Sequence, residues 1–380
     1  MRLLSISHHA QFLGANRSLL HLIKGLSEKY EVQALVFCPS EGPFTVALRA
    51  ANIPYVVKPY ANWGYSLVSK KLWMFPWVWW RSKQKILPEV MAAAKDFNPD
   101  VIHSNSSLVA LGWQLAERLD KPHIWHIREF GWLDYKIVFP LGKKRLREKL
   151  NKATHVVTIS NALKTRIETG LLVKSKVIYN GIGTVSAIKN SYEEGLSQNK
   201  ASQFIFLIIG LVHPAKRQLE AVRAFNNVYK KHPNTRLIIA GNGRKSYEYL
   251  LRFQAWKDGT SQAIEFCGFV TNTAEVYTRS NVVLICSRHE AMGRVIAEAM
   301  SYGKPVIGYR GGAIPEIIES GVQGECYESE EELTKIMIQL IENPDKLRNM
   351  GLKGCERASS LFSDEAYVEK FYNLMSAAVN

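Results

Sequence analysis

The apolar positions of this 380-residue chain fall into short runs that alternate with longer amphipathic segments. Short apolar strands, each followed by a helical pattern, predict a parallel sheet that is covered by helices on both faces. In the first half of the chain this pattern predicts helices at 18–26 and through Leu48, and strands at 3–6, 32–37, 55–57, 101–102, 123–127, 155–159 and 176–179.

The pattern restarts after a polar stretch at 184–202, where we place the boundary between two domains. It then predicts a helix at 218–230 and strands at 204–209, 236–240, 264–266, 282–286 and 305–309, the last of which closes the series. We therefore expect an α/β protein with two Rossmann-like, doubly wound domains, 1–182 and 183–362, the first completed by a C-terminal helix at 363–380. Ligands bind beyond the carboxyl ends of such strands, so two domains facing each other across a cleft would form a two-substrate site.

The two halves of the chain differ strongly in net charge. The net charge is +15, and residues 1–180 hold 26 Lys and Arg against 12 Asp and Glu, a surplus of 14. The remaining 200 residues hold 23 against 22, so the second half is nearly neutral. A strongly basic half attracts an anionic surface, which phospholipid, nucleic acid or a phosphorylated substrate would offer.

Cysteine usage and the apolar runs indicate the compartment. The five cysteines are scattered and form no CxxC pair, which argues against a disulfide framework or zinc site and fits a reducing compartment. The apolar start at 1–7 is too short for a signal peptide, and the run at 72–80 is too short to span a bilayer.

The strongest chemical signal is the stretch 287–300, which follows an apolar strand and opens an amphipathic helix. Glu290 falls in the loop after the strand, and Gly293 allows close approach of the backbone to a ligand. The helix N-terminus that follows offers free N–H groups to a phosphate. Glu298 lies within the helix and could accept hydrogen bonds from two ribose hydroxyls. Two glutamates on a solvated helix face are the alternative.

This stretch resembles the E-x7-E motif of glycosyltransferase family 4, which has the GT-B fold, and the similarity covers nearly the whole chain. Five further segments resemble parts of the same family, at 210–216, 241–243, 267–270, 303–316 and 177–181. The resemblance implies a retaining enzyme whose first domain binds the acceptor and whose second domain binds the nucleotide-sugar donor.

The resemblance also implies roles for single residues. Glu290 would hold hydroxyls of the donor sugar, Glu298 the ribose, and Lys216 the diphosphate, where a compact ammonium offsets the charge of the departing nucleotide. Backbone amides at Met292 and Gly293 would help to hold the sugar and phosphates. The donor side would further include the strand-end residues Gly210, Gly243 and Val270.

One position departs from the family pattern. The family places an arginine after the glycine that corresponds to Gly210, and this chain has Leu211 there. Arg217 or Arg294 could replace the missing cation. We favour Arg294 because it lies within the donor motif.

The first half carries the counterpart residues on the acceptor side. The segment 12–19 resembles the family's glycine loop, with its double glycine reduced to Gly14, followed by Ala15. His126 resembles the histidine that faces the sugar in related enzymes, and a structural histidine is the alternative. Arg128 and His103 could line the acceptor side, and an ordinary loop is equally compatible with His103.

Two segments of the first half are rich in basic residues, and one of them also contains several tryptophans. Tryptophans and cations alternate at 70–85, and a second basic stretch follows at 143–149. Such a mixture suits an anionic membrane surface, with rings at headgroup level. Core tryptophans with a solvated basic face are the alternative. Single-stranded nucleic acid would also fit cations and rings, but it leaves the donor motif unexplained, so we expect no nucleic-acid partner.

These observations together predict a transferase that moves a sugar from a nucleotide-diphosphate sugar to a glycan or polyprenyl-diphosphate-linked acceptor. We expect it to act in bacterial surface polysaccharide or glycolipid synthesis, at the cytoplasmic face of the membrane. No Asp-x-Asp string or metal cluster is evident in the sequence, so we expect neither a metal nor a cofactor. A nucleotide-sugar epimerase or hydrolase, or a non-catalytic nucleotide-sugar binding protein, remains an alternative. No G-x-G-x-x-G follows the first strand, as a dinucleotide dehydrogenase would require.

Overall fold

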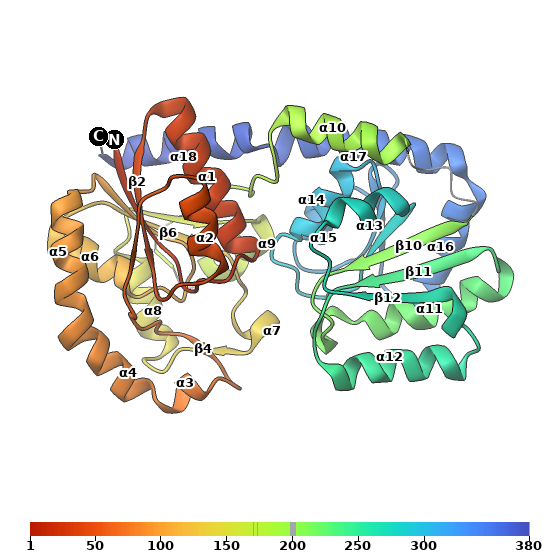
Figure 1. Ribbon diagram of the computed structural model, residues 1–380, viewed down its shortest axis with the longest axis horizontal. Coiled ribbons are helices and arrows are strands. Elements are labelled where there is room, and N and C mark those ends of the chain that lie inside the picture. The colour runs from red at the N-terminus through yellow and green to blue at the C-terminus, as the bar shows by residue number, and fades with distance from the viewer. Residues whose placement is uncertain (170, 173, 198–202, 380) are drawn as a thin grey trace. The chain divides into compact units, whose positions relative to one another are not determined.

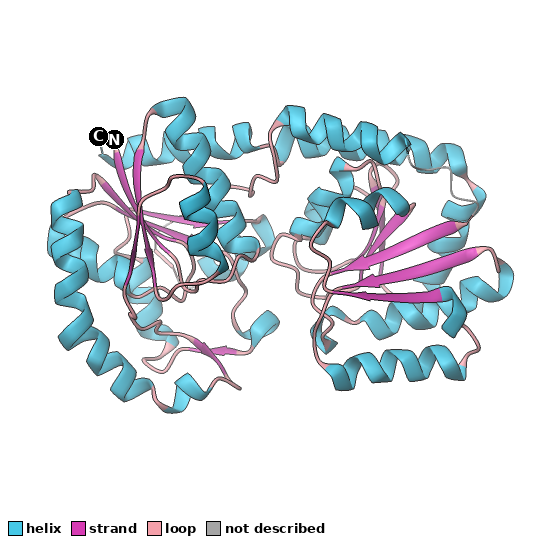
Figure 2. Cartoon of the chain, viewed as in Figure 1, coloured by secondary structure: helices cyan, strands magenta, loops and turns pink. Residues whose placement is uncertain are grey.

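A computed structural model describes residues 1–169, 171–172, 174–197 and 203–379. The chain forms two compact units, which we call domain 1 (Met1–Gly181 with Asp364–Asn380) and domain 2 (Ile182–Ser363). The chain passes between the domains twice, and each predicted boundary lies one residue from the boundary in the structure. Each unit is an α/β domain built on a parallel sheet (Figures 1 and 2), which confirms the predicted fold class.

Domain 1 is built on a seven-stranded parallel sheet of order β3-β2-β1-β5-β6-β8-β9. The order reverses between β1 and β5, so the carboxyl ends of these neighbours form a switch point where ligands bind in such folds. The strands are β1 (Arg2–Ile6), β2 (Gln33–Cys38), β3 (Tyr55–Val57), β5 (Val101–Ser104), β6 (His123–Ile127), β8 (His155–Thr158) and β9 (Lys176–Val177).

Helices cover both faces of this sheet because its strands carry apolar side chains on both sides. On one face α1 (Gly14–Tyr30) and the C-terminal α18 (Asp364–Val379) pack on strand residues such as Leu3 and Ile124, as the predicted completion by a C-terminal helix requires. On the other face α5 (Leu87–Phe97) and α6 (Leu111–Leu119) pack on Leu4 and Ile102. The remaining α-helices of the domain are α2 (Pro43–Ala50), α3 (Lys70–Trp73), α4 (Phe75–Arg81), α7 (Trp132–Tyr135), α8 (Lys143–Leu150) and α9 (Asn161–Glu168), and a π-helical turn, Ser82–Ile86, joins α4 to α5.

A small antiparallel pair joins two segments that lie far apart in the sequence. Strand β4 (Tyr65–Ser66) pairs with β7 (Ile137–Val138), and the Leu67 amide donates to the Lys136 carbonyl at 3.0 Å. The turn that holds α7 therefore lies beside the segment that leads into α3 and α4.

Domain 2 is built on a six-stranded parallel sheet of order β12-β11-β10-β13-β14-β15, with its switch point between β10 and β13. The strands are β10 (Phe204–Ile209), β11 (Thr235–Ala240), β12 (Ile264–Gly268), β13 (Val282–Ile285), β14 (Val306–Tyr309) and β15 (Gly324–Tyr327). The prediction that the strand at 305–309 closes the series was wrong, because β15 pairs with β14 in parallel.

The helices of domain 2 again form two layers. On one face α11 (Gln218–Lys231), α12 (Lys245–Lys257) and α16 (Glu330–Glu342) share the main core with the strands. The other helices are α10 (Val185–Ser197), α13 (Thr273–Arg279), α14 (Arg294–Ser301), α15 (Ile314–Ile317) and α17 (Pro344–Leu361). The domain boundary was placed at the stretch 184–202, and domain 2 begins just before it, at Ile182. The described part of this stretch is largely the helix α10, which packs on α13, α14 and α17. The Lys304 ammonium fastens this helix by donating to the Gly195 carbonyl at 2.9 Å.

Candidate nucleotide-sugar site

The candidate donor site of domain 2 lies at the carboxyl ends of β10 and β13, the two strands that flank the switch point. The loop after β10 carries Lys216, and the loop after β13 carries Glu290. Parallel strands end at the same edge of the sheet, so residues 74 positions apart in the sequence come together there.

Lys216 and Glu290 form an ion pair, with Nζ 2.7 Å from Oε2. Their side chains are 32% and 19% exposed, so the pair is open to solvent on one side. A charged pair that is half-buried and reachable from solvent can exchange its internal contact for contacts with a ligand. The ammonium suits a phosphate and the carboxylate suits sugar hydroxyls.

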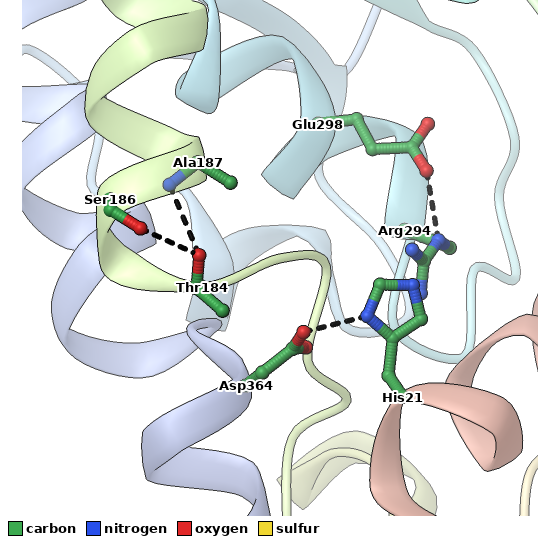
Figure 3. A network of polar contacts seen from close by, with 7 residues as sticks. All are labelled: His21, Thr184, Ser186, Ala187, Arg294, Glu298 and Asp364. Carbon is green, nitrogen blue, oxygen red and sulfur yellow. Dashed lines mark hydrogen bonds and ion pairs between the residues drawn. The ribbon is translucent and has the colours of Figure 1, made fainter. Parts of the chain in front are cut away.

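The second glutamate of the motif is held more tightly. Figure 3 shows the Arg294 guanidinium directed at Glu298, with Nε 2.8 Å from Oε1, one helical turn apart on α14. The Tyr277 hydroxyl of α13 donates to the other carboxylate oxygen at 3.1 Å. Tyr277 is fully buried and stacks on Tyr302, with ring centroids 5.2 Å apart. Glu298 is therefore oriented by two donors from two helices.

The glycines that surround this site permit very close backbone contacts. A Cβ on Gly243 would lie 1.8 Å from the Val212 carbonyl oxygen, and one on Gly241 would lie 1.9 Å from that of Gly210. Because these residues have no Cβ, the loop after β11 can pack directly against the loop after β10. On the other side, a Cβ on Gly312 would lie 2.6 Å from the Glu290 carbonyl oxygen. Only glycine lets these loops converge on Lys216 and Glu290.

The remaining donor residues predicted from the sequence border the same strand ends. Gly293 has a φ of 69°, in the left-handed region, and caps α14 without a side-chain hydrogen bond. Met292 is buried, so a ligand would meet its backbone rather than its side chain. Gly210 directly follows β10, and Val270 lies in the loop after β12.

The two candidate replacements for the missing arginine lie in different surroundings. Leu211 is about half exposed. Arg217 is bound to Glu220 of its own helix, with Nε 2.7 Å from Oε2, and lines a cavity of about 400 Å³ with Arg223 and Glu330. Arg294 instead touches Glu298, so of the two it is the arginine that contacts a residue of the motif.

In domain 1, Arg128 is the centre of a buried polar network at the end of β6. Its Nε donates to Asn105 Oδ1 at 2.7 Å, and its other nitrogens contact Asn180, Tyr367 and His126. The Asn105 amide in turn donates to the Ala15 carbonyl at 3.2 Å. The structure thus joins Arg128 and Ala15, two of the residues predicted for the acceptor side, with His126, which was predicted as a catalytic residue that faces the sugar.

His126 and His103 both lie in the interior of domain 1. Each ring packs on Phe371 of α18, and both side chains are fully buried. Burial, together with the nearby Arg128 charge, holds the pKa of each imidazole well below its ordinary value, so both rings are neutral. This placement favours a structural histidine, and a role for either ring in contacting a sugar stays a prediction.

Gly14 and Glu129 also border the switch point of domain 1. Gly14 is the first residue of α1, where an added Cβ would meet no atom within 4 Å, so the space above it is open. Glu129 was not singled out in the sequence. Its carboxylate is buried and accepts hydrogen bonds from Ser106 Oγ at 3.0 Å and the Ser107 amide at 2.8 Å. Burial raises the pKa of Glu129, although these donors oppose the shift.

The aromatic and basic segment 70–85 lies on the surface of domain 1. Trp73 is 86% exposed, and Trp77 and Trp80 are each 54% exposed, so these rings do not form core. The β4–β7 pair places the exposed Trp132 and Tyr135 near this segment. We call α3, α4 and α7 together the aromatic surface of domain 1. None of the described helices has the length and apolar character to cross a membrane.

Within the part of the chain that the structure describes, no three His, Cys, Asp or Glu side chains gather as a metal site would require. The expectation that the reaction needs no metal stays a prediction, because a metal can also be held by the phosphates of a substrate.

Two family models match the two domains. One, described as Glycosyltransferase Family 4, matches residues 13–185, and the other, described as Glycosyl transferases group 1, matches residues 194–357. Together they span most of both domains.

Curated proteins and solved structures that resemble this chain are also glycosyltransferases or share their fold. The Alpha-monoglucosyldiacylglycerol synthase of Acholeplasma laidlawii is 25% identical, across 94% of this chain and 91% of that protein. The N-acetyl-alpha-D-glucosaminyl L-malate synthase of Bacillus anthracis is 28% identical, across 72% of this chain and 74% of that protein. The structure of Anabaena HepE in complex with UDP superposes with a TM-score of 0.81 at 22% identity, covering 99% of this chain and 100% of that one.

Proposed function

Because this chain belongs to glycosyltransferase family 4, we propose that it moves a sugar from a nucleotide-diphosphate sugar to a lipid-linked or glycan acceptor, with retention at the anomeric carbon. The observation that carries the donor side of this proposal is the Lys216–Glu290 pair at the switch point of domain 2. The acceptor side is supported by the aromatic surface and the charge of domain 1.

The Lys216–Glu290 pair suggests how the donor is activated. When the sugar–phosphate bond breaks, its electron pair passes to the departing diphosphate, and the Lys216 ammonium offsets the new charge. Glu290 would accept hydrogen bonds from hydroxyls of the sugar and fix its orientation. Binding the donor exchanges the 2.7 Å contact between the two side chains for contacts with the two halves of the ligand.

Retention follows from attack on the same face of the sugar that the diphosphate leaves. The acceptor oxygen forms the new bond to the anomeric carbon as the bond to the phosphate oxygen breaks. The acceptor proton passes to that phosphate oxygen. This route needs no protein nucleophile, only donors that stabilise the leaving group.

Glu298 and Arg294 would hold the rest of the donor. The Glu298 carboxylate, oriented by Arg294 and Tyr277, has oxygens that can accept from the two ribose hydroxyls. Arg294 would take over the charge that the family's arginine supplies at the position of Leu211. Arg294→Ala should then weaken nucleotide diphosphate binding about 10-fold more than it weakens binding of the free nucleoside. Equal losses for both ligands would exclude a diphosphate role.

The acceptor is proposed to be a glycan or a polyprenyl-diphosphate-linked or other lipid-linked molecule at the cytoplasmic face of a bacterial membrane. The names of two relatives support small and lipid acceptors, since one is an alpha-monoglucosyldiacylglycerol synthase and the other an N-acetyl-alpha-D-glucosaminyl L-malate synthase. The exposed tryptophans of α3 and α4 and the basic helix α8 suit an anionic membrane surface. Assembly of a surface polysaccharide or glycolipid fits such a location.

The transfer is tested by offering UDP-, GDP- and ADP-linked sugars together with a bacterial lipid extract, and by reading the products by mass spectrometry and NMR. A glycosylated acceptor with the anomeric configuration of the donor supports the proposal. Release of free sugar without any glycosylated product would favour a hydrolase. An inverted product would overturn the retaining mechanism. Binding of a nucleotide sugar with no turnover at all would favour a non-catalytic binding protein.

A further inference from the structure

Helix α12 of domain 2 is apolar on both of its sides. Its inward side places Tyr247, Leu251 and Ala255 in the main core of the domain. Its outward side also carries large apolar residues, and Figure 1 shows the helix along the outside of domain 2. The exposed residues are Tyr249 at 68%, Leu250 at 44%, Phe253 at 57% and Trp256 at 70%. We call these four residues the α12 stripe.

The spacing of the stripe shows that it is one continuous surface. Tyr249, Phe253 and Trp256 follow each other at intervals of four and three residues, so their side chains line one side of the helix. The rings of Phe253 and Trp256 lie 5.8 Å apart between centroids. A surface helix of a soluble domain ordinarily turns polar residues to solvent on this side. The stripe is therefore a surface suited to a partner.

The charges around the stripe indicate the chemistry of that partner. Arg244, Lys245 and Lys257 are exposed at the two ends of the helix. The carboxylates nearby already have protein partners: Glu248 accepts from Arg252 at 2.8 Å, and Asp258 accepts from Gln254 at 2.7 Å. The stripe is thus flanked by cations at both ends, while the acidic groups are engaged within the domain.

We propose that the α12 stripe is a second membrane contact, located on the donor domain, that lays its rings among the headgroups of an anionic bilayer. Tyrosine and tryptophan have an apolar ring and a polar tip, which is the combination that the membrane interface favours. Lys245 and Lys257 would lie near lipid phosphates. A second copy of the chain is the less suitable occupant, since it would bring these cations to the same interface twice.

This contact goes beyond the proposed transfer activity and does not depend on it. It would tie the nucleotide-sugar domain, and not only the acceptor domain, to the surface on which a lipid-linked acceptor is held. The contact is additional to the aromatic surface of domain 1, which belongs to the other domain.

The test compares four full-length proteins: wild type, Phe253→Ser/Trp256→Ser, Trp73→Ser/Trp77→Ser, and the control Leu352→Ser, which removes an exposed apolar residue from α17. Co-sedimentation is measured with phosphatidylcholine vesicles that do or do not contain phosphatidylglycerol. The α12 variant should bind anionic vesicles about 10-fold more weakly than wild type, with the control unchanged. Unchanged circular dichroism and UDP binding would show that the variant is folded.

Two results would overturn the inference. In the first, the α12 variant binds vesicles as wild type does, while Trp73→Ser/Trp77→Ser accounts for the entire loss. In the second, sedimentation velocity shows a wild-type dimer that the α12 variant turns into a monomer, which would make a second copy the occupant. Neither result bears on the donor site, whereas a wild type that binds none of UDP, GDP and ADP would overturn the proposed function instead.

Discussion

The two domains share a parallel sheet with a switch point, but they place their charges differently. In domain 2, Lys216 and Glu290 meet at the strand ends and remain partly open to solvent. In domain 1, Arg128 at the corresponding sheet edge is buried among Asn105, Asn180 and Tyr367. The solvent-exposed charges of domain 1 lie on surface helices such as α8. This difference supports the proposal that domain 2 binds a small ligand at its strand ends, whereas domain 1 offers a buried polar network and an extended surface.

The largest effect that would sharpen this comparison is expected at the Lys216–Glu290 pair. Lys216→Ala should lower kcat about 100- to 1000-fold, because the charge on the departing diphosphate loses its nearest cation. The control is Lys346→Ala, which breaks another lysine–glutamate pair of domain 2 with an Nζ–Oε1 distance of 2.8 Å. Steady-state kinetics should show almost no change for the control. Equal losses in both variants would mean that the effect arises from stability and not from the site.

The next largest effect is a difference between the two domains in how their stability depends on pH. In domain 1 burial lowers the pKa of His8, His103 and His126, and that of His123 to about 3. The unfolded chain binds more protons than the folded one below about pH 6.5, so this contribution to stability is present above that pH and is lost as pH falls. Burial raises the pKa of Asp134 to about 7 and also raises that of Glu129, and these two carboxyls act in the opposite direction.

Domain 1 should therefore lose about 2–3 kcal/mol of its free energy of unfolding between about pH 6.5 and pH 5.5. Hydrogen exchange with mass spectrometry at both pH values gives the stability of each domain separately. The protection factors of amides in β5 and β6 should fall at the lower pH, with those of β10 and β11 little changed. The reverse order would contradict the assignment of neutral, buried histidines to domain 1.

A smaller effect tests the surface of domain 1. Lys143 and Lys144 are exposed in the first turn of α8. Each lysine near an anionic bilayer contributes about 1 kcal/mol, so Lys143→Ala/Lys144→Ala should weaken binding to phosphatidylglycerol vesicles about 10- to 30-fold. Raising the salt concentration should shrink the difference. The matched control is Lys346→Ala/Lys353→Ala, which removes two lysines from domain 2, and an equal loss there would assign the binding to net charge alone.

The smallest effect concerns the orientation of Glu298. Tyr277→Phe removes the hydroxyl that donates to Glu298 Oε2 at 3.1 Å and leaves the stacked ring in place. One hydrogen bond of this kind is worth about 1 kcal/mol, so nucleotide affinity should fall about five-fold. Calorimetry with UDP measures the loss, and Tyr302→Phe is the control because it keeps the stack. A fall in kcat without a fall in affinity would contradict a positioning role toward the nucleotide.

Much of the fold could be predicted from the sequence, because buried parallel strands are short apolar runs. Strands at 55–57, 123–127 and 204–209 were predicted with the bounds that the structure has. Strand β15 was missed because its residues, Gly324–Tyr327, form no apolar run. Helix α10 was missed because it buries only a few residues, among them Ile188, and its sequence is otherwise polar.

The candidate site was predictable where a motif carries it and not where contacts across the fold do. The sequence indicated Lys216 and Glu290, but only the fold brings them to 2.7 Å. Nothing in the pattern of α13 distinguishes Tyr277 from a tyrosine of the core. His126 was correctly predicted to lie in the strand at 123–127. That strand lies beneath α18, a helix more than 200 residues later, and no local pattern reveals that cover.

The most direct test of the donor site measures the thermal stability of the wild type and of Glu298→Ala with a panel of nucleotide diphosphates and their sugars. A ligand that binds only the folded protein raises Tm by an amount that grows with the ratio of its concentration to Kd. We predict a rise, measured from each protein's own Tm without ligand, with one nucleotide and its sugar that is largely absent in Glu298→Ala. An equal rise in both proteins, or no rise with any nucleotide at millimolar concentration, would contradict the assignment of the nucleotide-sugar site to domain 2.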